Sequence, residues 1–368
     1  MDLGELKFLN AFNAIPGVGA ATLREIKTRF GSFQKAWGAN DHALQDAASD
    51  SQARSALLER KRTIDPNREM QTIVREKIWT ITDAEDSFPR LLRQIPYPPL
   101  ILYGRGEKSV LSQTKLGTNM TLAVVGTRRP TAYGLEATEL LVGGLVEAGV
   151  VIASGLAMGI DAKAHAATLA HKGTTVAVLG SGADHYSIFP PENRGLAQRI
   201  IDSGGALISE YAPGTPAVKE HFPMRNRIIS GLSHGTLVVE AREKSGALIT
   251  ARLALEQNRE VFVVPGSIFS PTSAGPNKLI QEGAKAVTTA ADILEELGIN
   301  YQAAARENAA QSLDENETVL LKLLAEPLGM DAIKAKTGFP VPAIMASLSM
   351  LELKKLVRKL GGDTFQKV

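Results

Sequence analysis

Short apolar runs rich in β-branched residues alternate with helical stretches from about residue 77 to residue 289. We expect strands at Leu122–Val125, Val150–Ala153, Thr175–Leu179, Ala206–Ser209, Thr236–Val239 and Glu260–Val264. Because most of these runs are continuously apolar, both faces of each strand should be covered by helices, as in a parallel sheet built from βαβ units. The alternation therefore predicts an α/β fold with an extended, Rossmann-like parallel sheet.

The N-terminal stretch reads as a small helical unit. We expect helices at Leu3–Asn13, Ala20–Arg29 and Ser51–Thr63. Between the first two lies Ile15-Pro16-Gly17-Val18-Gly19, which is typical of a helix-hairpin-helix. Its glycines either let backbone amides approach a phosphate or only form a tight turn, and the sequence leaves both roles open.

The C-terminal stretch follows a segment, residues 301–316, that is poor in large apolar side chains and predicts a linker. Helix-period apolar residues then recur at Val319–Leu324, Met330–Lys336 and Pro342–Leu356. A turn at Arg358–Asp363 should join two short strands. Three helices and a hairpin predict a winged-helix domain. The domains that we expect are residues 1–72 (helical), 77–295 (Rossmann-like) and 317–368 (winged helix).

Composition excludes several classes of site. The chain has 41 Lys and Arg residues against 39 Asp and Glu residues, so a nucleic-acid site has to be a local patch of cations. It has no cysteine, and its six histidines form no ligand cluster, so we expect no metal site. The first residues lack the pattern of a signal peptide, and no apolar run reaches the roughly 20 residues of a membrane span. We expect a cytoplasmic protein without a membrane partner.

Glycines and small polar residues follow the expected strands. Gly126 and Thr127 come after the first strand, Ser154 and Gly155 after the second, and Gly180-Ser181-Gly182 after the third. The carboxyl ends of parallel strands meet at one rim of a sheet, where open α/β folds bind ligands. Small residues there let backbone amides face an anion, so the sequence predicts a phosphate-binding rim.

The motifs of the common phosphate cofactors are absent from this rim. The first turn lacks G-x-G-x-x-G and the second strand ends in Ser154 rather than an acidic residue, which disfavours NAD. No P-loop motif G-x-x-x-x-G-K-[ST] occurs, so we expect no cofactor. A nucleic-acid backbone fits better, because Ser245-Gly246 would add backbone amides and cations fall in or just after the rim loops. These cations are Arg128, Arg129, Lys219, Arg225, Arg227 and Lys244.

Five sequence blocks occur in the order found in one protein family. They are Gly126–Arg128, Ser154–Asp161 with His165, His221–Leu232, Ser245–Ala251 and Val263–Gly266. In that order they resemble the signature blocks of the DprA (Smf, DNA processing protein A) family across the whole Rossmann-like domain. The end domains resemble the family's SAM-like and DML1-like winged-helix domains more loosely. A mild difference is Thr127, where many relatives carry serine, since both side chains supply a hydroxyl.

The resemblance implies a protein without catalytic activity that binds and protects single-stranded DNA, forms a homodimer and loads the RecA recombinase during natural transformation and recombination. The family's strand-binding pocket matches Arg128, Lys219 and Phe222, which agrees with phosphate neutralisation by cations and base stacking on an aromatic ring. Relatives pair through a segment that matches Leu279 and Ile280. The full set of expected DNA-binding residues is Gly126, Thr127, Arg128, Ser154, Gly155, Lys219, Phe222, Arg225, Arg227, Lys244, Ser245 and Gly246.

Several individual roles stay open. Phe222 either stacks on a base or belongs to the core. Arg225 and Arg227 either reach DNA or lock neighbouring loops through hydrogen bonds. We expect Asp161 to stabilise the N-terminus of its helix and to pair with His165, four residues further on.

Two other classes of function fit the sequence less well. A nucleoside-monophosphate phosphoribohydrolase binds anions at the same rim, but its P-G-G-x-G-T motif is replaced by Ser245–Thr250, and Glu240 lacks the expected surroundings. A winged-helix transcription factor needs a recognition helix with polar base readers, whereas Ala343–Leu348 is mainly apolar. The C-terminal domain is therefore better explained as an interaction module.

Overall fold

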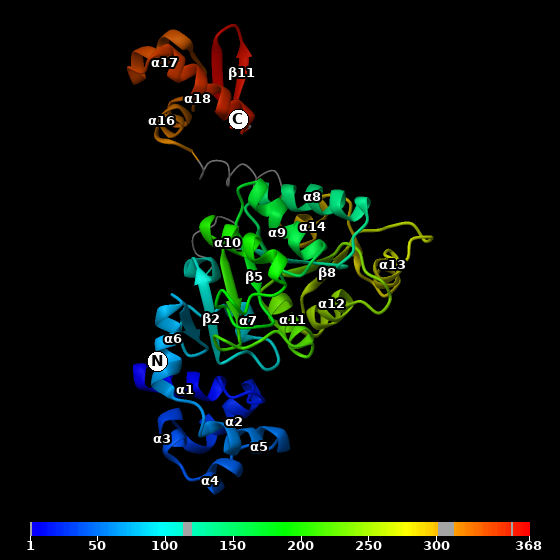
Figure 1. Ribbon diagram of the computed structural model, residues 1–368. Coiled ribbons are helices and arrows are strands. Elements are labelled where there is room, and N and C mark those ends of the chain that lie inside the picture. Colours follow the sequence, from blue (N-terminus) through cyan, green and yellow to red (C-terminus); the bar gives the residue numbers. More distant parts are fainter. Residues whose placement is uncertain (1, 113–119, 301–312, 355) are drawn as a thin grey trace.

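The computed structural model describes residues 2–112, 120–300, 313–354 and 356–368 (Figure 1). Its centre is a nine-stranded sheet with the order β1-β2-β6-β5-β4-β3-β7-β8-β9. The strands from β6 to β9 in this order are parallel, whereas β1 pairs with β2, and β2 with β6, in antiparallel fashion. The bounds are β1 Trp79–Thr82, β2 Ile101–Gly106, β3 Thr121–Val125, β4 Val151–Ser154, β5 Thr175–Val178, β6 Ala206–Ser209, β7 Gly235–Val238, β8 Glu260–Val263 and β9 Lys285–Ala286.

Helices cover both faces of this sheet (Figure 1). One face packs against α8 (Ala132–Glu147), α9 (Ile160–Ala170), α10 (Arg194–Asp202) and α14 (Ala290–Glu296). The other packs against α7 (Arg90–Arg93), α11 (His221–Gly231), α12 (Gly246–Glu256) and α13 (Ala274–Gln281). Two short 3-10 turns, Lys108–Ser112 and Pro191–Asn193, complete the domain. This three-layer arrangement explains why the central strands are apolar on both sides, and it confirms the predicted fold class.

All six predicted strands are present, shifted by no more than one residue at either end. The antiparallel edge formed by β1 and β2 was not predicted, and neither was β9. Gly104 and Gly106 lower the strand propensity of β2. In the fold, Gly104 is required because a Cβ atom there would lie 2.1 Å from the Trp79 ring on the neighbouring strand.

The N-terminal helices are α1 Leu3–Asn13, α2 Ala20–Phe30, α3 Phe33–Gly38, α4 Asp41–Gln45, α5 Ser51–Lys61 and α6 Pro66–Arg75. The three predicted helices are confirmed, while α3, α4 and α6 were missed because each is short or strongly polar. In the hairpin between α1 and α2, Ile15 and Val18 are buried in the domain's core and Gly17 has a φ of +94°. The hairpin thus has a structural role as a turn, and DNA contact by it stays untested.

The C-terminal domain is a winged helix, as predicted. It contains α16 (Glu315–Leu323), α17 (Met330–Thr337) and α18 (Val341–Leu353). Its sheet has the order β10-β12-β11, with β10 Leu328–Gly329, β11 Val357–Gly361 and β12 Thr364–Lys367. The turn between β11 and β12 is therefore shorter than the predicted Arg358–Asp363.

Most of the predicted linker, residues 301–312, lies outside the described residues. The last two residues of the predicted linker, 315 and 316, already belong to α16, whose N-cap Asp314 forms a capping box with Glu317. Within the described ranges, no helix has both the length and the apolar character needed to cross a membrane.

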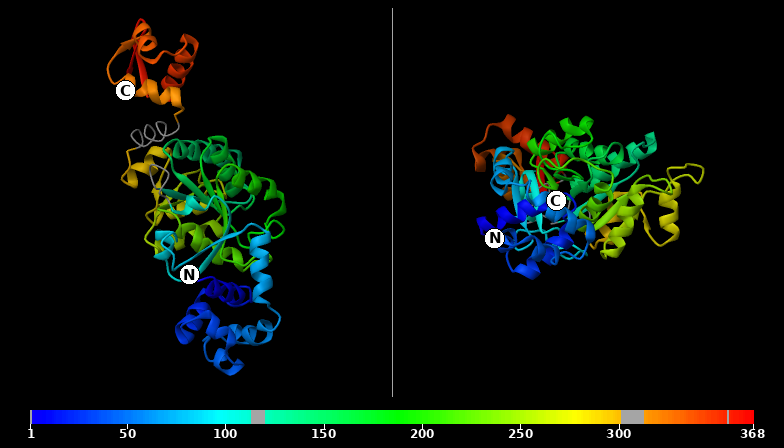
Figure 2. Two further views of the ribbon diagram at one scale, coloured as in Figure 1. Left: turned by 90° about the vertical axis from the view of Figure 1, so that its left-hand side faces the viewer. Right: turned by 60° about the horizontal axis from the view of Figure 1, so that its bottom comes forward.

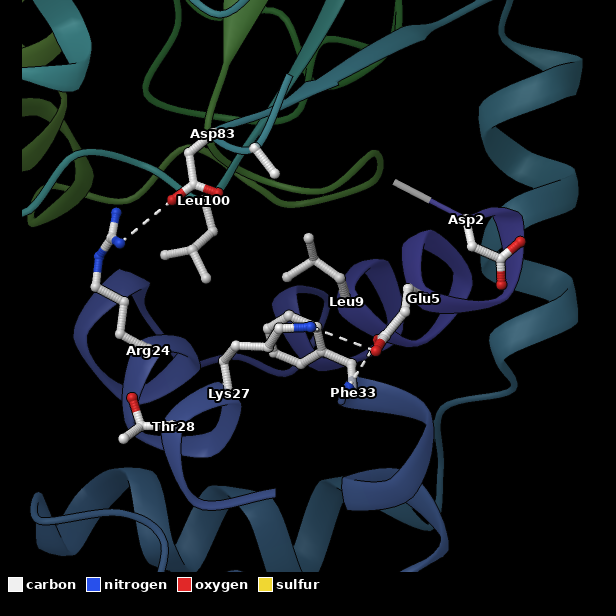
Figure 3. Close-up of a pocket in the computed structure, with 10 residues that line it drawn as sticks. Asp2, Glu5, Leu9, Arg24, Lys27, Thr28, Phe33, Asp83 and Leu100 are labelled. Atoms are coloured by element: carbon white, nitrogen blue, oxygen red, sulfur yellow. Dashed lines mark hydrogen bonds and ion pairs between the residues drawn. The ribbon is translucent and has the colours of Figure 1, made fainter. Parts of the chain in front are cut away.

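The N-terminal helices lie at one end of the central domain, below β2 in Figure 1 and at the bottom of the left view of Figure 2. Leu100, Ile101 and Tyr103 from the sheet side belong to the same apolar core as the helices. A pocket of about 510 Å³ remains at this junction (Figure 3). There Arg24 pairs with Asp83 at 3.2 Å, joining α2 to the loop after β1. Leu9, Phe33 and Leu100 are among the residues that line it.

Tyr103 provides the first testable prediction. Its hydroxyl is fully buried, donates a hydrogen bond to Asn10 Oδ1 at 2.7 Å and accepts one from Asn13 Nδ2 at 3.2 Å. Tyr103→Phe should lower the free energy of unfolding by about 1–3 kcal/mol, because it removes the hydrogen-bond donor of the buried Asn10 Oδ1, whereas Asn13 Nδ2 keeps a bond to Glu210 O. Urea denaturation measures this. The control is Tyr133→Phe, which removes a half-exposed hydroxyl bonded to Pro265 O; equal losses in both variants would contradict the prediction.

Candidate nucleic-acid interface

A groove of about 600 Å³ lies at the carboxyl ends of the parallel strands. The chain runs from β3 outward through β4, β5 and β6, and then returns to the other side of β3 with β7, so the direction of winding reverses beside β3. Ligands of doubly wound folds bind at such a reversal. The turn after β3, the start of α11 and the start of α12 all contribute residues to the groove.

Seven of the expected DNA-binding residues line this groove. They are far apart in the sequence, and the fold brings them together because the segments that carry them leave the same rim of the sheet. They are Gly126, Arg128, Lys219, Phe222, Arg225, Ser245 and Gly246.

Phe222 is half-buried, and two arginines lie near its ring. The guanidinium carbons of Arg128 and Arg225 lie 5.7 Å and 6.0 Å from the centroid of its ring. Part of the ring packs on Gly180, where a Cβ atom would approach it to 3.0 Å. Both roles left open by the sequence are therefore compatible with the structure: Phe222 fills space over the turn after β5 and presents an edge or face to the groove.

Arg225 is buried and holds two rim turns in place. It donates hydrogen bonds to Gly155 O at 2.8 Å and to Val178 O. Asp161 accepts a hydrogen bond from Gly155 N at 3.1 Å. Burial raises the pKa of Asp161 to about 6, although the charge of Arg225 opposes this rise. Arg225 therefore locks neighbouring loops through hydrogen bonds, which is one of the two roles that the sequence left open for it. It also lines the groove.

The other expected DNA-binding residues lie outside the groove lining. The Ser154 hydroxyl is buried and donates to Val124 O at 2.6 Å, and Arg227 forms an ion pair with Glu210. Thr127 donates its backbone N–H to Glu240 O at 2.7 Å. Gly155 is held by Arg225, as described above, and Lys244 is an exposed residue just before α12. Contact of these residues with DNA stays a prediction.

The predicted pair between Asp161 and His165 is wrong. His165 is fully buried, and its Nδ1 forms a hydrogen bond of 2.7 Å with Thr175 Oγ1 on β5 rather than with Asp161. Burial lowers the pKa of His165 to about 3, and the charge of Arg225 acts in the same direction. The i,i+4 spacing put both residues on one helix, but tertiary packing gave each a partner elsewhere.

Glu240 occupies the N-terminus of α8. Its carboxylate accepts hydrogen bonds from Thr131 N at 2.9 Å, Thr131 Oγ1 at 2.7 Å and Thr272 Oγ1 at 2.8 Å. Gly134 leaves room for it, since a Cβ atom there would lie 2.3 Å from Glu240 Oε2. In a dinucleotide-binding fold this position holds a phosphate. Here an internal carboxylate fills it, and Glu240 is only 2% exposed and does not line the groove.

Phe189 lines the groove but was missed by the sequence analysis. It lies in the loop after β5, and its ring centroid is 5.8 Å from that of Phe222. The available signal was its place in Ile188-Phe189-Pro190-Pro191, nine residues after the glycine of a rim turn at Gly180. An isolated aromatic residue in a loop gives no indication of what it faces until the loop is folded.

The fold and the groove define a Rossmann-type α/β protein with cations and aromatic rings at the carboxyl ends of its parallel strands, followed by a winged-helix domain. Comparison with protein families agrees. Residues 79–298 match the model of DNA recombination-mediator protein A, and residues 303–363 match the DprA winged helix domain. The chain belongs to this family, known as DprA or Smf.

Individual relatives support the assignment. The chain is 49% identical to DNA processing protein DprA of Bacillus subtilis, covering 60% of this chain and 71% of the relative, and 42% identical to protein Smf of Escherichia coli, covering 76% and 75%. The crystal structure of DprA from Streptococcus pneumoniae superposes with a TM-score of 0.67 at 33% identity, covering 80% of this chain and 98% of that one. A structure of DNA processing protein A from Helicobacter pylori, described as having a unique single-stranded DNA binding mode, superposes with a TM-score of 0.52 at 29% identity, covering 60% and 95%.

The raised pKa of Asp161 predicts a pH dependence of stability. Between pH of about 4 and about 6 the folded protein binds the Asp161 proton more tightly than the unfolded chain, so the stability contributed by this proton is lost as the pH rises through that window. Relative to Asp161→Asn, the parent should lose up to about 1.4 kcal/mol of unfolding free energy per pH unit there. Urea denaturation of both proteins across this range measures the difference; parallel pH profiles would show that Asp161 titrates normally.

Proposed function

We propose that the groove binds the backbone and bases of single-stranded DNA with little sequence preference. The observation that carries this proposal is the contact between the Arg128 guanidinium and the Phe222 ring inside a groove that also contains Lys219. Cations neutralise phosphates of any sequence, and an aromatic ring stacks on any base. The single-stranded DNA binding named for the Helicobacter pylori relative supports the same ligand.

The N-terminus of α12 adds a second kind of phosphate partner. Ser245 is the N-cap, and its side chain accepts a hydrogen bond from Ala247 N at 3.3 Å, while exposed Gly246 lies in the groove lining. Backbone amides at a helix N-terminus favour an anion. The neighbouring α8 offers no such free position, because Glu240 already occupies it. A strand bound in the groove would therefore pass the start of α12 rather than that of α8.

The proposed role is strand binding without catalysis. Glu240, the acidic residue considered for a phosphoribohydrolase, is committed to hydrogen bonds with Thr131 and Thr272. In the α18 helix the exposed side chains include Met345, Met350 and Leu353, which suit protein contact better than base readout. Together with the family's description as a recombination mediator, this supports handover of the strand to RecA in recombination and transformation.

We further propose a homodimer paired through α13. Leu279 is 5% exposed and belongs to the core of its own chain, so it has little surface left for a partner. Ile280 is half-buried and remains available for contact with a second copy of the chain.

The matches at residues 79–298 and 303–363 support domains near 77–295 and 317–368, preceded by the helical domain at 1–72.

Removal of a groove cation tests the proposed DNA site. Arg128→Ala or Lys219→Ala should weaken binding to every single-stranded sequence and flatten the dependence of log K on log salt by about 0.7 per lost contact. Fluorescence anisotropy with labelled oligonucleotides across a salt series measures both quantities. Equal-length duplexes should bind more weakly than single strands. If both variants retain the parent's affinity and slope, the strand does not run through this groove.

The dimer has its own test. Ile280→Lys should give folded monomers, because a charge at the centre of a symmetric contact meets its own copy. Sedimentation velocity reports the mass, and circular dichroism checks the fold. A variant that remains dimeric would place the interface elsewhere on the molecule.

A further inference from the structure

Phe189 exposes 44% of its surface although the residue before it, Ile188, is buried. A single exposed apolar residue is common on protein surfaces and carries little information. Phe189, however, is exposed into a groove that also contains Phe222, Arg128 and Lys219. Its ring has a defined place there, 5.8 Å from the Phe222 ring with the two planes inclined by 48°.

The loop that carries Phe189 is fixed by hydrogen bonds on both sides. Asp184 accepts from Ser187 N at 3.2 Å and Ser187 Oγ at 2.8 Å through one carboxylate oxygen, and from Gly214 N at 2.6 Å through the other. Arg194 donates to Tyr186 O at 2.6 Å and to Ile188 O at 3.3 Å. The backbone of the loop is therefore held in place before any ligand arrives, which lowers the entropic cost of binding.

The geometry of the two rings decides how bases can use them. Carbon atoms in contact lie about 3.5–4.0 Å apart, so a base inserted between two rings needs centroids about 7–8 Å apart. The rings of Phe189 and Phe222 are closer than that and inclined to each other. A base cannot enter between them, and each ring can receive a base only on its free side.

We propose that Phe189 is a second stacking residue of the groove, so that the site receives two unpaired bases, one on Phe189 and one on Phe222. This inference rests on the proposed binding of single-stranded DNA and adds to it the number of bases and the residue that receives the second one. Base stacking on an aromatic ring is tolerant of sequence, which fits a site that accepts any strand.

The test uses the full chain with Phe189→Ala and fluorescence anisotropy on two labelled strands, an oligothymidine and an abasic strand of the same length. On oligothymidine the variant should bind about 5- to 150-fold more weakly than the parent, the effect of one lost stacked base. On the abasic strand the variant and the parent should bind equally, because there is no base to stack. The salt slope should not change, since no phosphate contact is lost. Phe189→Trp should retain the parent's affinity.

Tyr186→Ala is the matched control. Tyr186 lies in the same loop and is 81% exposed but does not line the groove, so its removal should leave oligothymidine binding unaltered. The inference is overturned if Phe189→Ala binds oligothymidine like the parent, or if its defect is equally large on the abasic strand. Arg128→Ala separates the two proposals. If Arg128→Ala binds more weakly and Phe189→Ala does not, the inference about Phe189 is wrong but the proposed DNA site stands. If Arg128→Ala also binds like the parent, the proposed DNA site itself is wrong.

Discussion

The guanidinium of Arg225 lies buried at the rim of the sheet, where it donates to Gly155 O after β4 and to Val178 O at the end of β5. A buried guanidinium has to be paired and hydrogen-bonded, and Asp161 supplies the opposite charge nearby. The guanidinium carbon of the same side chain lies 6.0 Å from the centroid of the Phe222 ring. The shape of the groove therefore depends on Arg225, because it fixes the rim turns and one wall of the groove at once.

The N-termini of α8 and α12 lie at the same rim but differ in whether they can accept an anion. At α8 a buried carboxylate, Glu240, satisfies the backbone amide of Thr131, so the position used by phosphate cofactors is filled from within. At α12 the N-cap Ser245 leaves Gly246 exposed to the groove. Two helices with the same orientation relative to the sheet thus differ in whether an external anion can approach.

Charge in this protein acts locally rather than globally. The net charge of +2 gives little long-range attraction for a polyanion, so the proposed DNA site depends on the few cations that line the groove. Two other cations near the rim already have partners within the protein: Arg225 donates to Gly155 O, and Arg227 is bound to Glu210. Arg128 and Lys219 remain exposed, and Arg128 also lies against an aromatic ring. An exposed cation next to a ring suits a ligand with a phosphate and an unpaired base on each unit.

The sequence by itself determined the features that depend on local pattern. The six mainly apolar runs became the central strands because strands covered on both faces need apolar residues, and the glycines after several of them marked the rim. Tertiary structure decided the rest. Arg225 finds its acceptors 70 and 47 residues away, His165 bonds to Thr175 rather than Asp161, and Phe189 reaches Phe222 only when its loop folds against the start of α11. Partners so distant along the chain leave no periodic signal, since their contact depends on the packing of the whole sheet.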